Sequence, residues 1–147
     1  MAVRAVIDTN IWVSALLNPS GFPAKVRRAF EDGLFRAVVS EPIIGELVGV
    51  LNRPRIKDKY GLEAEEIREL LILLEEKTEG VSLNGDFVLC RDPDDNFIVE
   101  TAIKGQAQYL VTRDDDIKWD PEVIKFLEKS DIKVITVAKF LAILHRA

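Results

Sequence analysis

The sequence predicts an α/β domain in which a parallel sheet is covered by helices on both faces, an α/β/α sandwich. Short apolar runs rich in β-branched residues, typical of buried strands, alternate with segments whose apolar residues recur at helical spacing. This alternation favours parallel strands, because parallel neighbours need a crossover that a helix usually supplies. The 147 residues, 48% of them hydrophobic, contain no repeat or linker, so we expect one domain over residues 1–147.

The predicted strands are short. Four are well marked, at Val3–Ile7, Phe35–Val39, Tyr109–Val111 and Lys133–Ile135. The segment from Val81 to Leu89 is ambiguous and offers a short strand near Phe87–Leu89.

The predicted helices follow the strands. They run from Thr9 to Leu17, from Ala24 to Glu31, from Ser40 to Leu51, from Glu63 to Glu79, from Asp94 or Asp95 to Ile103, from Pro121 to Lys129 and from Thr136 through Leu144. We expect Ser40 and Thr136 to act as N-caps, and Gly33 and Gly105 to end their helices. Pro54 stops the helix that follows Ser40, and a basic connection comes after it.

Composition limits the function classes. Twenty basic and 25 acidic residues give a net charge of −5, so binding to nucleic acid would have to rest on local chemistry. A single cysteine, Cys90, cannot form an internal disulfide and favours a reducing compartment. Arg4 and Asp8 interrupt any signal peptide, and the longest uncharged stretch, Thr9 to Ala24, is too polar to span a bilayer. We therefore expect a cytoplasmic protein without a membrane partner.

Acidic residues follow the predicted strands or begin the predicted helices. Asp8 follows the first strand, and Asp114, Asp115 and Asp116 follow the strand that contains Leu110. Ligands of open α/β sheets bind outside the carboxyl ends of the strands, where these side chains would converge. Glu46, in the second turn of a helix, and Asp95, at the start of another, are able to reach the same edge.

Each acid taken alone has a simple structural explanation, because Asp at a helix start is usually a cap or a partner of the helix dipole. Four or five carboxylates in one cleft would instead repel one another unless protons or cations neutralise them. Clustered oxygen ligands without Cys or His suit a hard cation, Mg²⁺ or Mn²⁺, which commonly serves phosphoryl chemistry.

Four segments carry these acids in order along the chain. They are Val6-Ile7-Asp8-Thr9-Asn10, Ser40-Glu41-Pro42-Ile43-Ile44-Gly45-Glu46-Leu47, Asp95-Asn96-Phe97-Ile98-Val99-Glu100-Thr101-Ala102 and Tyr109-Leu110-Val111-Thr112-Arg113-Asp114-Asp115-Asp116. The set resembles the four acidic motifs of the PIN-domain nucleases, and most closely those of the short VapC-type toxins of toxin–antitoxin pairs. The resemblance implies a metal-dependent single-strand endoribonuclease that is inhibited by a cognate antitoxin and forms a homodimer.

The resemblance also implies roles for individual residues. The metal-binding acids would be Asp8, Glu46, Asp95 and Asp114, with Asp116 as a further contributor or as the alternative to Asp114. The polar supporting positions of the family correspond to Thr9, Asn10 and Thr112. The number of metal ions, one or two, stays open, as does the choice between Asp114 and Asp116.

Two further surfaces are predicted. Basic residues near the motifs or in the dense basic stretch are candidates for RNA binding: Arg53, Arg55, Lys57, Arg91 and Arg113. The helices from Pro23 to Glu31 and from Glu63 to Glu79 carry more apolar residues than a lone surface helix needs. The candidates for a self-complementary dimer patch are Trp12, Phe22, Phe30 and Leu73.

Other functions remain as alternatives. A haloacid-dehalogenase-type phosphatase would need Asp at position 10, where Asn stands, and a phospho-receiver would need an acidic pair where only Asp8 stands. A nuclease that processes RNA or cleaves DNA, and a non-catalytic binding module on the same fold, stay open. The only histidine, His145, lies near the C-terminus and outside the four motifs. Its position excludes a mechanism based on a general-acid histidine.

Overall fold

The computed structural model describes residues 3–85, 95–113 and 120–146. Within these ranges, five parallel strands form one sheet with the order β3-β2-β1-β4-β5. Their bounds are β1 Val3–Ile7, β2 Phe35–Ser40, β3 Glu79–Val81, β4 Tyr109–Val111 and β5 Lys133–Ile135. The central strand, β1, therefore separates two strands on one side from two on the other.

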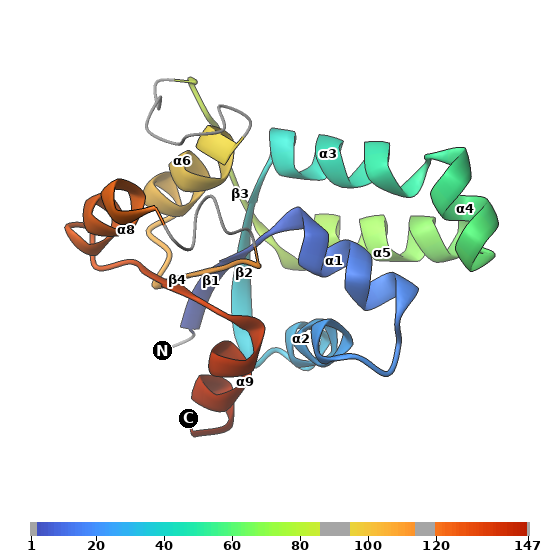
Figure 1. Cartoon of the computed structure of the whole chain (residues 1–147), viewed down its shortest axis with the longest axis horizontal. Helices are drawn as coiled ribbons and strands as arrows, with labels where there is room; N and C mark the ends of the chain where they lie inside the picture. The colour runs from blue at the N-terminus through green and yellow to red at the C-terminus, as the bar shows by residue number, and fades with distance from the viewer. Residues whose placement is uncertain (1–2, 86–94, 114–119, 147) are drawn as a thin grey trace.

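Helices cover both faces of this sheet, which confirms the predicted fold class (Figure 1). The bounds are α1 Thr9–Leu17, α2 Phe22–Glu31, α3 Glu41–Leu51, α4 Pro54–Tyr60, α5 Ala64–Lys77, α6 Asn96–Lys104, α8 Pro121–Glu128 and α9 Val137–Arg146. In the view of Figure 1, α6 and α8 lie left of the sheet, and α1, α2, α3 and α5 lie right of it. The helices α3, α4 and α5 extend away from the sheet, with α4 at the far end, and we call them the arm.

Two apolar cores follow from the alternation of side chains along the strands. In β1, Ala5 and Ile7 belong to the core shared with α1, α2, α5 and α9, whereas Val6 belongs to the core shared with α6 and α8. Both faces of β1 and β4 are therefore covered, which explains the apolar runs Ala5–Ile7 and Leu110–Val111.

The aromatic residues gather in the first core. Phe35 meets Phe140 edge-on, with ring centroids 4.9 Å apart, and Trp12 meets Phe30 at 5.4 Å. Trp12 and Phe30 are only 1% and 2% exposed, so their assignment to a dimer patch was wrong. Phe30 lies on the inward stripe of the amphipathic helix α2, and Trp12 lies in α1, most of which is buried. Phe22, at the start of α2, is 59% exposed.

Two predicted boundaries differ from the structure. The long helix ends at Lys77, and Glu79–Val81 forms the edge strand β3. The sequence Glu-Gly-Val has only one β-branched residue and therefore does not predict a strand. The connection expected after Arg53 contains helix α4, because Pro54 ends one helix and also occupies the first turn of the next. The strand expected near 87–89 lies outside the described residues.

Ser40 occupies the N-cap position of α3, as predicted, but its side chain does not cap the helix. Its hydroxyl instead lies 2.8 Å from the Thr101 hydroxyl on α6. The Thr136 hydroxyl, by contrast, accepts a hydrogen bond from the Lys139 N–H at 3.2 Å, as expected of an N-cap.

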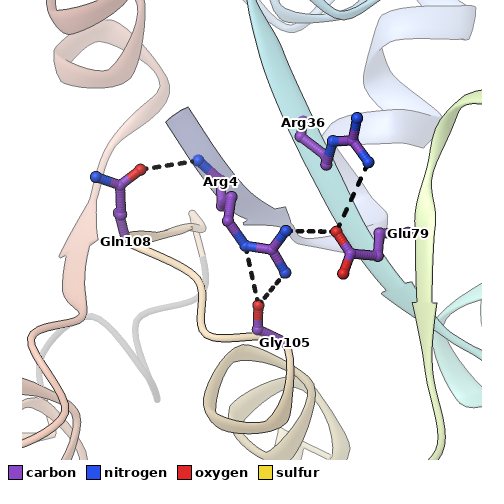
Figure 2. A network of polar contacts seen from close by, with 5 residues as sticks. All are labelled: Arg4, Arg36, Glu79, Gly105 and Gln108. Carbon is purple, nitrogen blue, oxygen red and sulfur yellow. Dashed lines mark hydrogen bonds and ion pairs between the residues drawn. The ribbon is translucent and has the colours of Figure 1, made fainter. Parts of the chain in front are cut away.

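An arginine network joins three strands to the end of α6 (Figure 2). Arg4 on β1 forms an ion pair with Glu79 on β3, and Arg36 on β2 lies 3.9 Å from the same carboxylate. Arg4 also donates hydrogen bonds to the carbonyl of Gly105, the C-cap of α6. The network joins the C-terminal end of α6 to β1, β2 and β3.

No helix in the described ranges combines the length and the apolar character needed to cross a membrane.

Candidate active site

The order in which the chain adds strands to the sheet reverses between β1 and β4. The chain passes from β1 to β2 and β3 on one side, then returns to the other side of β1 for β4 and β5. The carboxyl ends of the strands flanking such a switch point are where open α/β sheets bind ligands. Ile7 pairs with Val111 in the register of these two strands, so the residues that follow, Asp8 and Thr112, come next to each other.

Asp8 and Thr112 are joined by a hydrogen bond. The Thr112 hydroxyl donates to Oδ2 of Asp8 at 2.7 Å, and the Asp8 N–H donates to the Val111 carbonyl at 3.0 Å. Asp8 is 3% exposed and Thr112 is fully buried. The sequence thus places a buried, oriented carboxyl group at the switch point.

Asp8 and Asp95 begin helices α1 and α6, but neither side chain accepts a hydrogen bond from the first turn of its own helix. Asp120, by contrast, caps α8, because its carboxylate accepts hydrogen bonds from the N–H groups of Glu122 and Val123. The capping explanation therefore fits Asp120 and does not fit the two acids of the predicted motifs.

The position of Asp95 follows from the packing of α6. Thr101 on α6 lies level with Ser40, the last residue of β2, through the contact between their hydroxyl groups. The C-cap of α6, Gly105, lies against Val38 in the middle of β2, so the axis of α6, followed towards its N-terminus, runs from Val38 past Ser40. Asp95 precedes Thr101 by six residues, or about 9 Å along a helix. Asp95, 9% exposed, therefore lies beyond the carboxyl ends of the strands.

Glu46 is placed differently. It lies in the second turn of α3, which begins directly after β2, and its side chain is exposed. Among residues 3–85, 95–113 and 120–146, no three acidic, histidine or cysteine side chains lie close enough together to hold a metal ion. Asp114 and Asp116 lie outside these ranges, so the complete predicted ligand set is not among the described residues.

The neighbours of Asp8 differ in exposure. Thr9 is fully buried, and within the described part of the chain its hydroxyl has no hydrogen-bond partner. Asn10 is exposed. A buried carboxyl group beside an unsatisfied buried hydroxyl fits a site for a hard cation, which prefers such oxygen ligands.

A comparison with known families bears on this site. Residues 4–116 match the PIN domain family. The chain belongs to that family. The match includes Asp8, Glu46, Asp95 and Asp114 and covers β1 through β4.

Two relatives extend the comparison. The PIN domain is 29% identical over 141 residues to the uncharacterized protein MJ1680 of Methanocaldococcus jannaschii, covering 95% of this chain and 90% of that protein. It is also similar to a chain in the crystal structure of VapBC2 from Rickettsia felis bound to a DNA fragment from their promoter. That likeness has a TM-score of 0.51 over 91% of this chain and 98% of the other, at 16% identity, and it establishes a shared fold.

The predicted RNA-binding residues are separated in the PIN domain. Arg113 follows Thr112 at the site edge and donates a hydrogen bond to the Ser14 hydroxyl on α1. Arg53, Arg55 and Lys57 belong to α4 and its N-cap, at the far end of the arm (Figure 1). Arg91 lies outside the described residues.

Sequence reasoning missed Glu100 of the PIN domain. This residue of α6 is 1% exposed, and its carboxylate accepts hydrogen bonds from the N–H groups of Asn84 at 2.8 Å and Gly85 at 3.1 Å. Lys104 lies 2.9 Å from the same carboxylate. Burial opposes ionisation, but the bonds from Lys104, Asn84 and Gly85 together lower the pKa of Glu100.

Glu100 thereby ties the chain after β3 to the helix that Asp95 begins. The sequence feature that could have indicated a buried Glu100 is its position within a run of apolar and small residues. In the structure, positions 98–102 are all buried. A charged residue in such a run must find partners, but the sequence does not reveal that they are backbone N–H groups 15 and 16 residues earlier.

Proposed function

We propose that this PIN domain is a divalent-metal-dependent endoribonuclease that hydrolyses single-stranded RNA and acts as the toxin of a toxin–antitoxin pair. One observation carries the proposal most directly. The buried carboxyl group of Asp8 is held by Thr112 at the switch point of the sheet, and it does not cap its own helix. A carboxyl group that is buried and oriented at the switch point of an open α/β sheet lies where such sheets bind ligands.

The proposed metal ligands are the acids of the four motifs, Asp8, Glu46, Asp95 and Asp114, with Asp116 as a further contributor. The donor set consists of carboxylate oxygens, which fits Mg²⁺ or Mn²⁺ better than a softer metal. When bound, such an ion lowers the pKa of a coordinated water and offsets charge that develops on the phosphate oxygens.

The protein residues have their own tasks in this reaction. Thr112 holds one oxygen of Asp8 and thereby orients the other. Arg113 is exposed beside α1 and is the basic residue placed to meet an RNA phosphate at the edge. Hydrolysis joins a water oxygen to phosphorus and breaks the bond to the leaving oxygen, which takes up a proton.

The proposed partners are a cognate antitoxin and a second copy of the chain. The likeness of the motifs to VapC-type toxins and of the fold to a chain of VapBC2 supports the antitoxin. A basic side chain of the antitoxin would bind the acids of the proposed metal site and replace the charge of the metal. Sedimentation at tens of micromolar checks the homodimer, which a purely monomeric profile would contradict.

The substrate class is tested by comparing end-labelled single-stranded RNA, double-stranded RNA and single-stranded DNA with purified protein. We expect internal cleavage of single-stranded RNA with Mg²⁺ or Mn²⁺ and none with excess chelator. Preferred cleavage of DNA would favour the alternative of a DNA-cleaving PIN nuclease. Binding of RNA without cleavage under every metal condition would favour a non-catalytic module.

A further inference from the structure

The tip of the arm carries a dense group of positive charge. Four basic residues fall in and beside α4, namely Arg53, Arg55, Lys57 and Lys59, against the single acid Asp58. Within the described part of the chain, no ion pair or side-chain hydrogen bond involves these four cations. The group stands out because the whole chain has a net charge of −5.

Helix stability does not explain this arrangement. Lys57 and Lys59 lie in the last turn of α4, where cations favour the helix dipole. Arg53 and Arg55 lie at the N-cap and in the first turn, which contains no acid, and there a cation opposes the dipole. These two arginines weaken the helix slightly, so a binding role accounts for them better than a folding role.

An exposed aromatic ring adjoins the charges. Tyr60, the last residue of α4, is 45% exposed, and the Lys59 ammonium lies 5.2 Å from the centre of its ring. Cations beside an exposed aromatic side chain are the usual elements of a surface for single-stranded nucleic acid, where phosphates meet the cations and bases stack on the ring. A protein partner would instead favour an apolar centre, and α4 contains no buried residue and one aliphatic side chain, the half-buried Ile56.

We propose that α4, with Arg53, Arg55, Lys57, Lys59 and Tyr60, is an auxiliary binding surface for single-stranded RNA. This inference rests on the proposed ribonuclease function for the identity of the nucleic acid. The 11 residues of α3 separate α4 from the end of β2, or about 16 Å. Bound RNA would therefore be held outside the site of cleavage, and α4 would contribute to RNA affinity without taking part in the reaction.

Binding is measured by fluorescence anisotropy of a labelled oligouridylate over a series of salt concentrations. The protein carries Asp8→Asn and no divalent metal is added, so the RNA stays intact. The test variant adds Arg53→Gln, Arg55→Gln and Lys59→Gln. The matched control adds Lys125→Gln, Lys129→Gln and Lys133→Gln, three exposed cations on α8, at its C-cap and on β5.

We expect the slope of log affinity against log salt, which is negative, to decrease in magnitude by about 2 in the test variant, because each of the three lost phosphate contacts removes about 0.7. Tyr60→Leu should leave the slope unchanged and weaken binding roughly fivefold or more, through the loss of stacking. The control variant should bind like the parent. Equal binding by the test and control variants would overturn the inference, and would leave an acidic protein as the remaining partner for α4.

Cleavage kinetics separate this inference from the proposed function. With Asp8 intact, the α4 variant should raise the KM for a long RNA and leave kcat unchanged. If the wild-type protein cleaves RNA and the α4 variant has the same KM, the inference fails and the proposed function stands. If no cleavage is found but the α4 variant loses RNA binding, the proposed function fails and the inference stands.

Discussion

The hydroxyl of Thr112 donates a 2.7 Å hydrogen bond to the carboxyl group of Asp8, across the ends of two strands whose residues are 104 positions apart in sequence. The bond is buried and lies at the switch point between β1 and β4. It fixes the orientation of the acid around which the proposed site is built.

Replacing Thr112 by Val should therefore affect activity more than stability. The change keeps the shape of the side chain and removes the bond to Asp8, so we expect RNA cleavage to fall roughly 10- to 100-fold. The free energy of unfolding should fall by about 1 kcal/mol. Cleavage rates and urea denaturation of the same preparations measure the two effects.

Thr78→Val is the matched control for this prediction. The Thr78 hydroxyl donates to the Leu74 carbonyl at the end of α5, away from Asp8, so its loss should lower stability without slowing cleavage. Equal activity of the two variants would show that Thr112 does not position Asp8.

Glu100 should make stability depend on acid pH. Its pKa in the folded protein lies below the ordinary value of 4.5, because the bonds from Lys104, Asn84 and Gly85 outweigh the effect of burial. A carboxyl group with a lowered folded pKa contributes stability that is fully present above the unfolded pKa and is lost as pH falls through the folded pKa.

We expect Glu100→Gln to lower the free energy of unfolding at neutral pH by roughly 1–3 kcal/mol, because it places an amide against backbone N–H donors. The difference from wild type should shrink as the pH falls below 4.5. Urea denaturation across this range checks it, with Glu128→Gln, an exposed acid of α8, as the control. A difference that stays constant with pH would show that the charge of Glu100 does not stabilise the fold.

Two glycines should respond in opposite directions to substitution by Ala. A Cβ at Gly105 would overlap Val38 Cγ1 on β2 and come within 3.0 Å of the Thr101 carbonyl, so Gly105→Ala should destabilise by about 1–3 kcal/mol. A Cβ at Gly49 in α3 would meet nothing within 4 Å, and Gly49→Ala should stabilise by roughly 0.5–1 kcal/mol. Thermal or urea unfolding gives both signs. In a protein that already carries Val38→Ala, Gly105→Ala should lower the free energy of unfolding by less than it does in the wild type. An equal loss of stability in both backgrounds would contradict the packing explanation.

The parts of the fold predictable from sequence are those that rest on local pattern. β1, α2 and α9 follow from apolar pattern, because the central strand is buried on both faces and each of the two helices has one inward stripe. β3 was missed because Glu79 is held in the sheet by Arg4, a tertiary contact that no local pattern records. The missing capping bond of Ser40 has the same origin, because its hydroxyl contacts Thr101 on α6.

The candidate site was predictable to a similar extent. The place of Asp8 follows from its position directly after a buried strand, and the parallel register brings Thr112 beside it. The partners of Glu100 and the remote position of Arg53 depend on how α6 and the arm are oriented, which the order of residues does not specify. The role of the acids at 114–116 stays a prediction.

The central claim is that Asp8 is a metal-binding acid of a ribonuclease site, and cleavage by Asp8→Asn tests it most directly. Purified wild-type and variant proteins are compared on one labelled single-stranded RNA, with Mn²⁺ or Mg²⁺ titrated into each and unfolding curves recorded in parallel. The variant keeps the shape of the side chain and removes a charged ligand, so we expect a folded protein whose metal-dependent cleavage is lost. Cleavage by Asp8→Asn at the wild-type rate and metal dependence would contradict the account.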